Sequence, residues 1–170
     1  VSLTVAVDGG GMVNPLHKGV DFIYENPLIE EIQELDAESG GSWISDSLSY
    51  PQANLPVFAG VSYLNGTNMY PVVERWRAFD PEGKYDEIYN RYAHVQIEVQ
   101  KDPVAEDERF ELLGGGDQFL VRLAPEDLEK LDVKYCVTTR DYAELETETF
   151  RAELKGQAGQ YRIYQFYYGE

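Results

Sequence analysis

The densest group of reactive side chains lies in residues 90–94, which read Asn-Arg-Tyr-Ala-His. An amide, a guanidinium, a phenol and one of the chain's 2 imidazoles fall within this short segment. The alternating residues 95–99 follow directly and predict a strand. Because α/β proteins place ligand contacts at the ends of helices and strands, this segment is the first candidate for a binding site.

Aromatic residues are common in the part of the chain that precedes this segment. The sequence has 13 Tyr and 2 Trp, and several of them fall between residues 50 and 92. Tyrosine and tryptophan offer an apolar face with a polar tip, which suits sugar rings and protein interfaces. The alternative is that many of these rings only build the core.

Other reactive chemistries find little support. A single cysteine, Cys136, excludes an intrachain disulfide and a cysteine metal cluster, and its apolar neighbours indicate a core residue. With only His17 and His94 there is no two-histidine metal motif, so no metal is expected. The glycine runs at residues 9–11 and 114–116 lack the endings of phosphate-binding loops and predict turns, so no cofactor is expected.

The charge of the chain limits its partners. Thirty-one acids against 14 bases give a formal net charge of −17. Such a surface repels phosphate backbones and anionic bilayers, so we expect no nucleic-acid partner. No stretch approaches the ~18 apolar residues of a membrane span, so no direct membrane insertion by this segment is expected.

The elements that must position the candidate residues alternate between strand and helix. A helix capped by Asn26 should begin at Pro27, and residues 48–66 should form a long irregular segment. Strands are expected at residues 1–7, 42–45, 95–100, 119–123, 133–138 and 161–168. Further helices are expected at residues 70–79, at 84–91, from 125 onward and, in part, over 142–150. This order predicts a single α/β (or α+β) domain over residues 1–170, with a mixed sheet and flanking helices.

Two stretches resemble a known family. Residues 60–70, followed by Glu74-Arg75-Trp76 and by residues 89–94, are similar to the soluble tail of bacterial multi-pass membrane proteins of the glycosyltransferase-like (YfhO-like) class. Residues 128–137 and the closing strand with Tyr161 and Tyr164 are similar to the end of the same tail. The chain also begins at Val1 without an initiating methionine. The resemblance implies an extracytoplasmic domain, excised from a larger membrane protein that carries the transferase chemistry.

From this resemblance we expect a non-catalytic accessory domain on the outer face of the cell membrane. Its partners would be the membrane-embedded remainder of the polypeptide, an acceptor glycan or another subunit. Six residues are then expected to converge on one concave patch: Asn65, Tyr70, Trp76, Asn90, Arg91 and His94. Trp76 would stack on a sugar, and Arg91 would hold a hydroxyl or a phosphate. Asn90 and His94 would orient hydroxyl groups.

Three alternatives stay open. The six residues could instead form a buried polar network that pins segment 48–66 to the sheet. The chain could be a free-standing hydrolase that uses His94 with a nearby acid. It could also be a purely structural interaction module without a small ligand.

Overall fold

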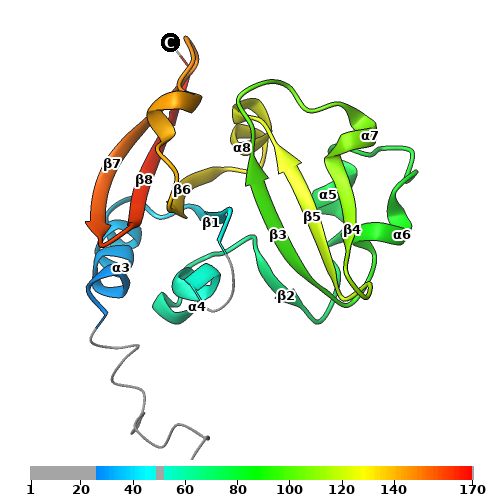
Figure 1. Cartoon of the computed structure of the whole chain (residues 1–170), viewed down its shortest axis with the longest axis horizontal. Helices are drawn as coiled ribbons and strands as arrows, with labels where there is room; N and C mark the ends of the chain where they lie inside the picture. The colour runs from blue at the N-terminus through cyan, green and yellow to red at the C-terminus, as the bar shows by residue number, and fades with distance from the viewer. Residues whose placement is uncertain (1–25, 49–51, 170) are drawn as a thin grey trace, which may run out of the picture.

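The computed structural model describes residues 26–48 and 52–169, so the strand expected at residues 1–7 lies outside the described part. The described chain forms an eight-stranded mixed sheet with flanking helices (Figure 1). The strand order is β4-β5-β3-β1-β6-β8-β7, and β2 pairs with β3 off this path. The α/β fold class predicted from the sequence is confirmed.

Four neighbouring strands are parallel and the outer strands are not. Strands β5, β3, β1 and β6 run parallel, whereas β4, β8 and the short β2 are antiparallel to their partners. The strands are β1 (Ser42–Asp46), β2 (Gly66–Asn68), β3 (Ala93–Val99), β4 (Phe110–Leu113), β5 (Gln118–Leu123), β6 (Val133–Thr138), β7 (Phe150–Ala158) and β8 (Tyr161–Tyr168). The helices are α3 (Pro27–Ser39), α4 (Leu55–Ala59), α5 (Val73–Arg77), α6 (Asp86–Tyr89), α7 (Glu106–Arg109) and α8 (Pro125–Lys130). The described residues also form two 3-10 turns, η1 (Gln52–Asn54) and η2 (Tyr142–Leu145).

Helix α3 starts as its sequence predicts. The Asn26 side chain accepts a hydrogen bond from the Leu28 amide at 3.0 Å, and Pro27 takes the first helical position. Ile32 and Leu35 on its buried stripe pack against the first half of the sheet. The helix ends before Gly40, whose φ of 57° disfavours other residues.

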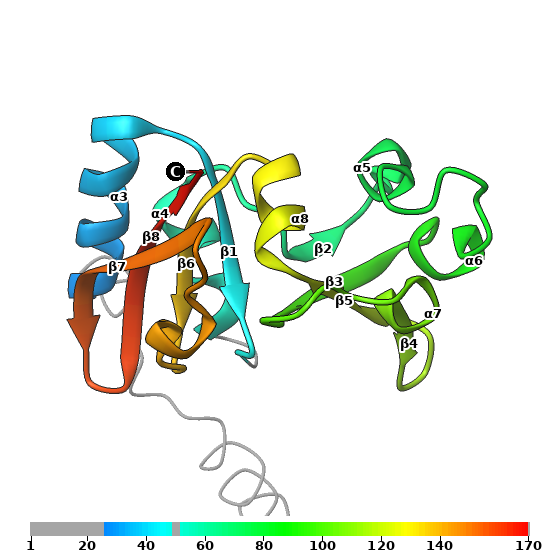
Figure 2. The ribbon, with the colours of Figure 1, turned by 90° about the horizontal axis from the view of Figure 1, so that it is seen from above.

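The sheet consists of two halves that meet along one short seam (Figures 1 and 2). Strands β1, β6, β8 and β7 form the first half, and β2, β3, β5 and β4 form the second. Between the halves, β1 and β3 are paired only where Asp46 faces Ile97. Side chains at this junction therefore decide how the halves are held together.

Helices cover opposite faces of the two halves. Residues of α3 and α4 pack with Trp43, Tyr135 and Val137 on one face of the first half. Figure 2 shows α5, α6 and α8 on one side of β3 and β5, and Trp76 and Tyr89 contribute to the core there. Ile44 and Ile97 belong to this same core, so it continues across the seam.

Segment 48–66 holds more regular structure than the sequence indicated. Its described part contains η1, α4 and the first residue of β2. The expected helices at 70–79 and 84–91 are shorter, at Val73–Arg77 and Asp86–Tyr89. The expected helix over 142–150 is only the turn η2, because Phe150 already begins strand β7. None of the described helices is both long and apolar enough to cross a lipid bilayer.

Candidate functional site

A buried ionic cluster occupies the seam between the two halves of the sheet. Asp46, at the carboxyl end of β1, is fully buried. Its Oδ1 accepts hydrogen bonds from the Val99 amide at 3.0 Å and the Ser47 hydroxyl at 2.8 Å. Its Oδ2 accepts from Arg140 Nη1 at 2.8 Å and the Tyr142 hydroxyl at 2.9 Å. All four donors therefore converge on one carboxylate.

This cluster fills a place where other folds bind ligands. The parallel strand β1 lies between β3 and β6. After β1 the chain first builds β3 on one side of β1 and later builds β6 on the other side. Open α/β sheets bind ligands at such a point, outside the carboxyl ends of the strands. Here Arg140 lies across it and donates to Asp46 and to the Val99 carbonyl, the latter at 2.6 Å. The protein's own ion pair thus occupies this position.

Burial dominates the electrostatics of the cluster. It raises the pKa of Asp46 above the ordinary value of 3.8, although the Val99 hydrogen bond and the Arg140 charge oppose it. It also raises the pKa values of Tyr142 and Cys136, whose oxygen and sulfur atoms lie 3.3 Å apart. Cys136 is a buried thiol within the core, which confirms its predicted structural role.

Two of the six predicted site residues, Asn65 and Trp76, are buried. Asn65 accepts from the Ser45 amide at 2.9 Å and donates to the Ser45 carbonyl at 2.8 Å. It therefore pins its segment to β1, which confirms the structural alternative for this residue. Trp76 is only 1% exposed, so the expectation that it stacks on a sugar is wrong. Its ring instead packs edge-on against Phe110 and Phe119, with centroids 6.3 and 6.2 Å away.

Arg91 also serves the fold. Its Nη1 donates to the Gly116 carbonyl at 3.1 Å and its Nε donates to the Glu87 carbonyl at 2.9 Å. These bonds connect the end of α6 to the turn between β4 and β5. The guanidinium that was expected to hold a hydroxyl or a phosphate is therefore bound to two backbone carbonyls.

The remaining three predicted residues, Tyr70, Asn90 and His94, reach the surface of one region. Tyr70 is 82% exposed, Asn90 is exposed and His94 is half-buried. Asn68 pairs with Ala93, so residues 69–70 after β2 lie beside residues 91–92 before β3. The six residues thus do not form one patch, but half of them share this end of the sheet.

Exposed apolar side chains mark the same region. Tyr92 is 65% exposed, and Met69 and Val72 are exposed as well. We call Met69, Tyr70, Val72 and Tyr92 the aromatic corner. Tyr92 and Met69 were missed as site residues, although Tyr92 lies in the segment that the sequence singled out. Tyr92 lies two residues before His94, which faces outward from β3, and this spacing could have identified Tyr92 from the sequence.

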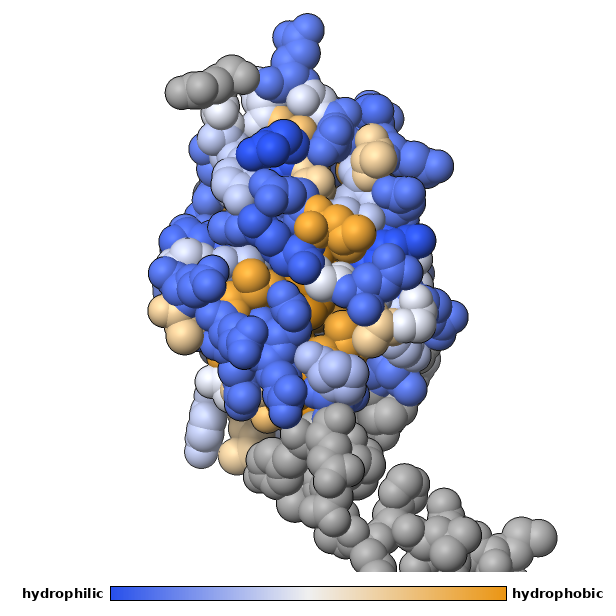
Figure 3. All heavy atoms as spheres, turned by 90° about the vertical axis from the view of Figure 1, so that its left-hand side faces the viewer, coloured by the Kyte–Doolittle hydropathy of each residue, from blue (hydrophilic) through white to orange (hydrophobic). Residues whose placement is uncertain are grey.

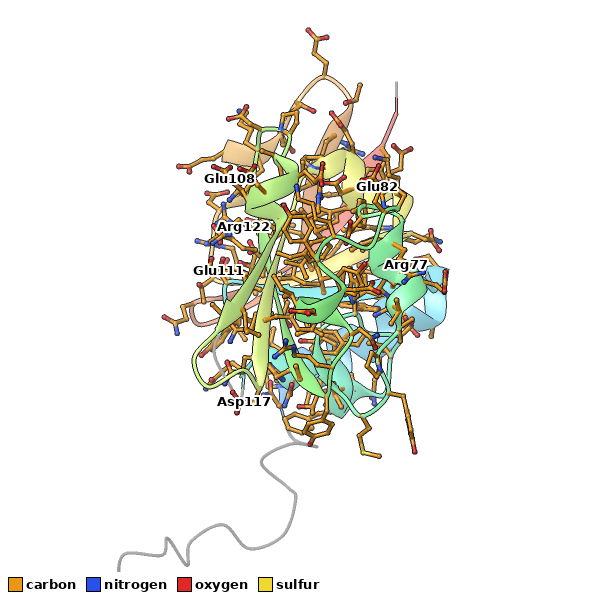
Figure 4. The ribbon with its side chains drawn as sticks, turned by 90° about the vertical axis from the view of Figure 1, so that its right-hand side faces the viewer. Arg77, Glu82, Glu108, Glu111, Asp117 and Arg122 are labelled. Atoms are coloured by element: carbon orange, nitrogen blue, oxygen red, sulfur yellow. The ribbon has the colours of Figure 1, made fainter. Side chains whose placement is uncertain are left out.

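The second half of the sheet leaves one face open. Along β3, Ala93, Val95, Ile97 and Val99 are buried, whereas the alternate side chains are half-exposed. In Figure 2, α5, α6 and α8 lie on the other side of β3 and β5. Figure 4 shows Glu108, Arg122, Glu111 and Asp117 along one side of the strands, with Arg77 and Glu82 on the opposite side. We call the following outward side chains of β2, β3, β4 and β5 the polar face: Thr67, His94, Gln96, Glu98, Glu111, Gln118, Leu120 and Arg122.

Cross-strand pairs organise the polar face. Thr67 Oγ1 lies 3.3 Å from His94 Nδ1, and Gln96 Nε2 donates to Gln118 Oε1 at 2.7 Å. Partial burial lowers the pKa of His94 from its ordinary value of 6.5, which favours the neutral imidazole at pH 7. Such neutral side chains suit hydrogen bonding to hydroxyl groups.

A family model described as "Domain of unknown function (DUF7654)" matches residues 22–169. The chain belongs to this family. No curated protein and no solved structure matches it. The DUF7654 match spans every element from α3 to β8, so both halves of the sheet are part of one family unit.

Two cavities of this DUF7654 domain border the polar face. One of about 250 Å³ lies beside the seam, between Ser47 and Leu48 on one side and Gln96, Glu98 and Leu120 on the other. The other, of about 510 Å³, lies at the start of β4 near α7 and includes Arg122 and Glu111. A third of about 490 Å³ lies away from this face, at the start of β7 and the end of β8. The polar face thus connects the aromatic corner with two hollows.

Proposed function

We propose that this domain is a non-catalytic accessory module that contacts a glycan through its aromatic corner. Its parent would be a membrane-attached glycosyltransferase-like protein, with the domain on the outer face of the membrane. The sequence resemblance supports this parent and location. The exposure of Tyr70 and Tyr92 beside Asn90 and His94 is the observation that carries the contact with a glycan.

Physical chemistry favours a glycan at this corner. Aromatic rings stack on the apolar faces of sugars. Exposure of the ring faces to water is unfavourable, and a ligand that covers them removes this unfavourable free energy. Asn90 and His94 supply donors and acceptors for hydroxyl groups next to these rings. Meanwhile Asn65, Arg91 and Asp46 are engaged within the fold, which leaves them little scope for catalysis.

A glycan array with the 170-residue chain tests the proposal. We expect Tyr92→Ala and Tyr70→Ala to abolish binding. The melting temperature of each variant should stay within about 2 °C of that of the unsubstituted chain, since both rings are exposed. Leu154→Ala removes an exposed apolar side chain from β7 and serves as the matched control with retained binding. If the unsubstituted chain binds no glycan, or the two tyrosine variants bind glycans as well as the unsubstituted chain does, the proposal fails.

One observation favours a second candidate, a hydrolase. The neutral His94 lies within 3.3 Å of the Thr67 hydroxyl, which is the arrangement of a base and a nucleophile. A catalytic pair also needs a group that orients the imidazole, and the β5 neighbour of His94 is the amide Gln118. Hydrolysis of a nitrophenyl ester or glycoside that disappears in both Thr67→Ala and His94→Ala would establish this function instead.

A further inference from the structure

We propose that the polar face binds an extended, uncharged oligosaccharide that runs along β3 from the aromatic corner to the cavity beside Ser47. This inference rests on the proposed glycan function and adds the class of ligand, its length and its direction.

The shape of the surface defines an elongated ligand. The outward positions of β3 from His94 to Glu98 lie on one side of the strand, and the exposed Tyr92 directly precedes the strand. At about 3.3 Å per residue, the distance from Tyr92 to Glu98 is roughly 20 Å, which is several sugar rings rather than one. The cavity of about 250 Å³ at Ser47 closes the far end of this path.

The amide pair in the middle of the path offers hydrogen bonds to hydroxyl groups. The bond from Gln96 Nε2 to Gln118 Oε1 uses one donor group and one acceptor of the two side chains. Gln96 Oε1 and the Gln118 amide group remain for a ligand. A fixed pair of planar amides on a rigid strand pair presents both an acceptor and a donor to the same ring.

Charge excludes an anionic ligand. Arg122 is the cation of the polar face, and its Nε lies 3.4 Å from Glu98 while its Nη2 contacts Glu111. Its Nη1 donates to the Glu108 carbonyl at 2.8 Å, so each nitrogen of the guanidinium is engaged. One arginine against two glutamates leaves the face negative, on a chain of net charge −17. A phosphate, sulfate or uronate would be repelled, whereas a neutral sugar would not.

Calorimetry with oligomers of defined length tests the inference. The probes are unbranched β-1,4-linked N-acetylglucosamine and α-1,4-linked glucose oligomers of two to six units, with oligogalacturonates of equal length as charged comparators. In at least one neutral series we expect affinity to rise about tenfold from two to four units and then to level off. We expect charged oligomers to bind at least tenfold more weakly.

Variants separate the middle of the path from its end. Gln96→Ala and Gln118→Ala should weaken tetramer binding about three- to tenfold, as expected for one or two hydrogen bonds, and leave dimer binding unchanged. Tyr92→Ala should abolish binding of both the tetramer and the dimer. Gln157→Ala, an exposed glutamine on β7, is the matched control and should change neither.

The outcomes distinguish this inference from the proposed function. Affinity that is independent of length and of Gln96, but sensitive to Tyr92, would overturn the extended path and keep the glycan-binding corner. Tighter binding of the charged oligomers would overturn the assignment of an uncharged ligand. Absence of binding by every oligomer, together with an empty glycan array, would overturn both proposals.

Discussion

At the scale of single residues, the polar and aromatic side chains divide by exposure into those that build the fold and those that face water. Trp76 and Asn65 are buried and contact the core or a strand backbone. Tyr70 and Tyr92 have large exposed areas and contribute little to the core. The same residue types therefore have opposite roles a few positions apart.

Replacing Trp76 should show this division directly. We expect Trp76→Ala to lower the free energy of unfolding by about 3–5 kcal/mol, because it removes a buried aromatic side chain and leaves a cavity. Tyr70→Ala should change it by less than about 0.5 kcal/mol. Urea unfolding followed by circular dichroism measures both changes in unfolding free energy. Equal effects of the two substitutions would contradict the burial of Trp76 and the exposure of Tyr70.

The sequence predicted residue types better than residue environments. It placed Cys136 in the core and Asn26 at a helix start, since local neighbours determine both. It did not distinguish Trp76 from Tyr70, because both lie in one segment of mixed polarity. Only the pairing of β2 with β3 and the packing of α5 separate them, and these contacts join residues about 25 or more positions apart.

At the scale of elements, the seam between β1 and β3 depends on a side chain more than on backbone pairing. One residue pair joins the two strands, and the Asp46 carboxylate adds bonds to β3 and to the chain after β6. Because every partner of this carboxylate is a donor, an amide cannot replace it without placing its NH2 group against other donors.

We expect Asp46→Asn to lower the free energy of unfolding at pH 7 by about 2–3 kcal/mol, since it leaves buried donors unpaired. The effect should also depend on pH. The folded-state pKa of Asp46 is raised above 3.8, so the folded protein holds this proton more tightly than the unfolded chain. The stability that comes from this tighter proton binding is fully present below pH 3.8 and is lost as the pH rises through the folded-state pKa of Asp46.

The difference in unfolding free energy between the parent protein and Asp46→Asn should therefore shrink as the pH rises above 3.8. Urea titrations from pH 4 to pH 7 measure it, and Asp102→Asn on the surface serves as the control. A difference that grows with pH would mean that the hydrogen bonds and the Arg140 charge, and not burial, determine the direction of the pKa shift of Asp46.

Elements with clear local patterns were predicted and those that depend on partners were not. The alternation of β3, the aromatic residues of β8 and the proline start of α8 are visible in the sequence. Strand β7 was missed because Ala152, Glu153 and Lys155 do not favour strands, and only its long pairing with β8 holds it extended. The polar face was not predicted either, because it depends on which side the helices leave open.

At the scale of the whole molecule, negative charge dominates the surface. Figure 3, which views the molecule from the β7 side, shows mostly hydrophilic residues with a few apolar ones between them. A net charge of −17 on one domain produces self-repulsion that opposes the compact state. This repulsion is screened by salt, since the Debye length falls from about 30 Å at 0.01 M to about 8 Å at 0.15 M.

We therefore expect sodium chloride to stabilise the protein. Raising its concentration from 10 to 150 mM should increase the melting temperature by about 2–4 °C, which corresponds to roughly 1 kcal/mol for a chain of this size. Calorimetry at constant pH measures the change, with an isosmotic glycerol series as the uncharged control. A melting temperature that stays constant or falls would show that the ion pairs outweigh the repulsion.

The route of the chain through the two halves has a consequence for synthesis. The second half is continuous from β2 to β5, so its strands can pair soon after Leu123 leaves the ribosome. The first half is split, because β1 comes early and its neighbour β6 starts only at Val133. Nascent β1 thus waits for more than eighty residues with one edge bare, and a pause in translation over that interval would prolong its exposure to chaperones and proteases.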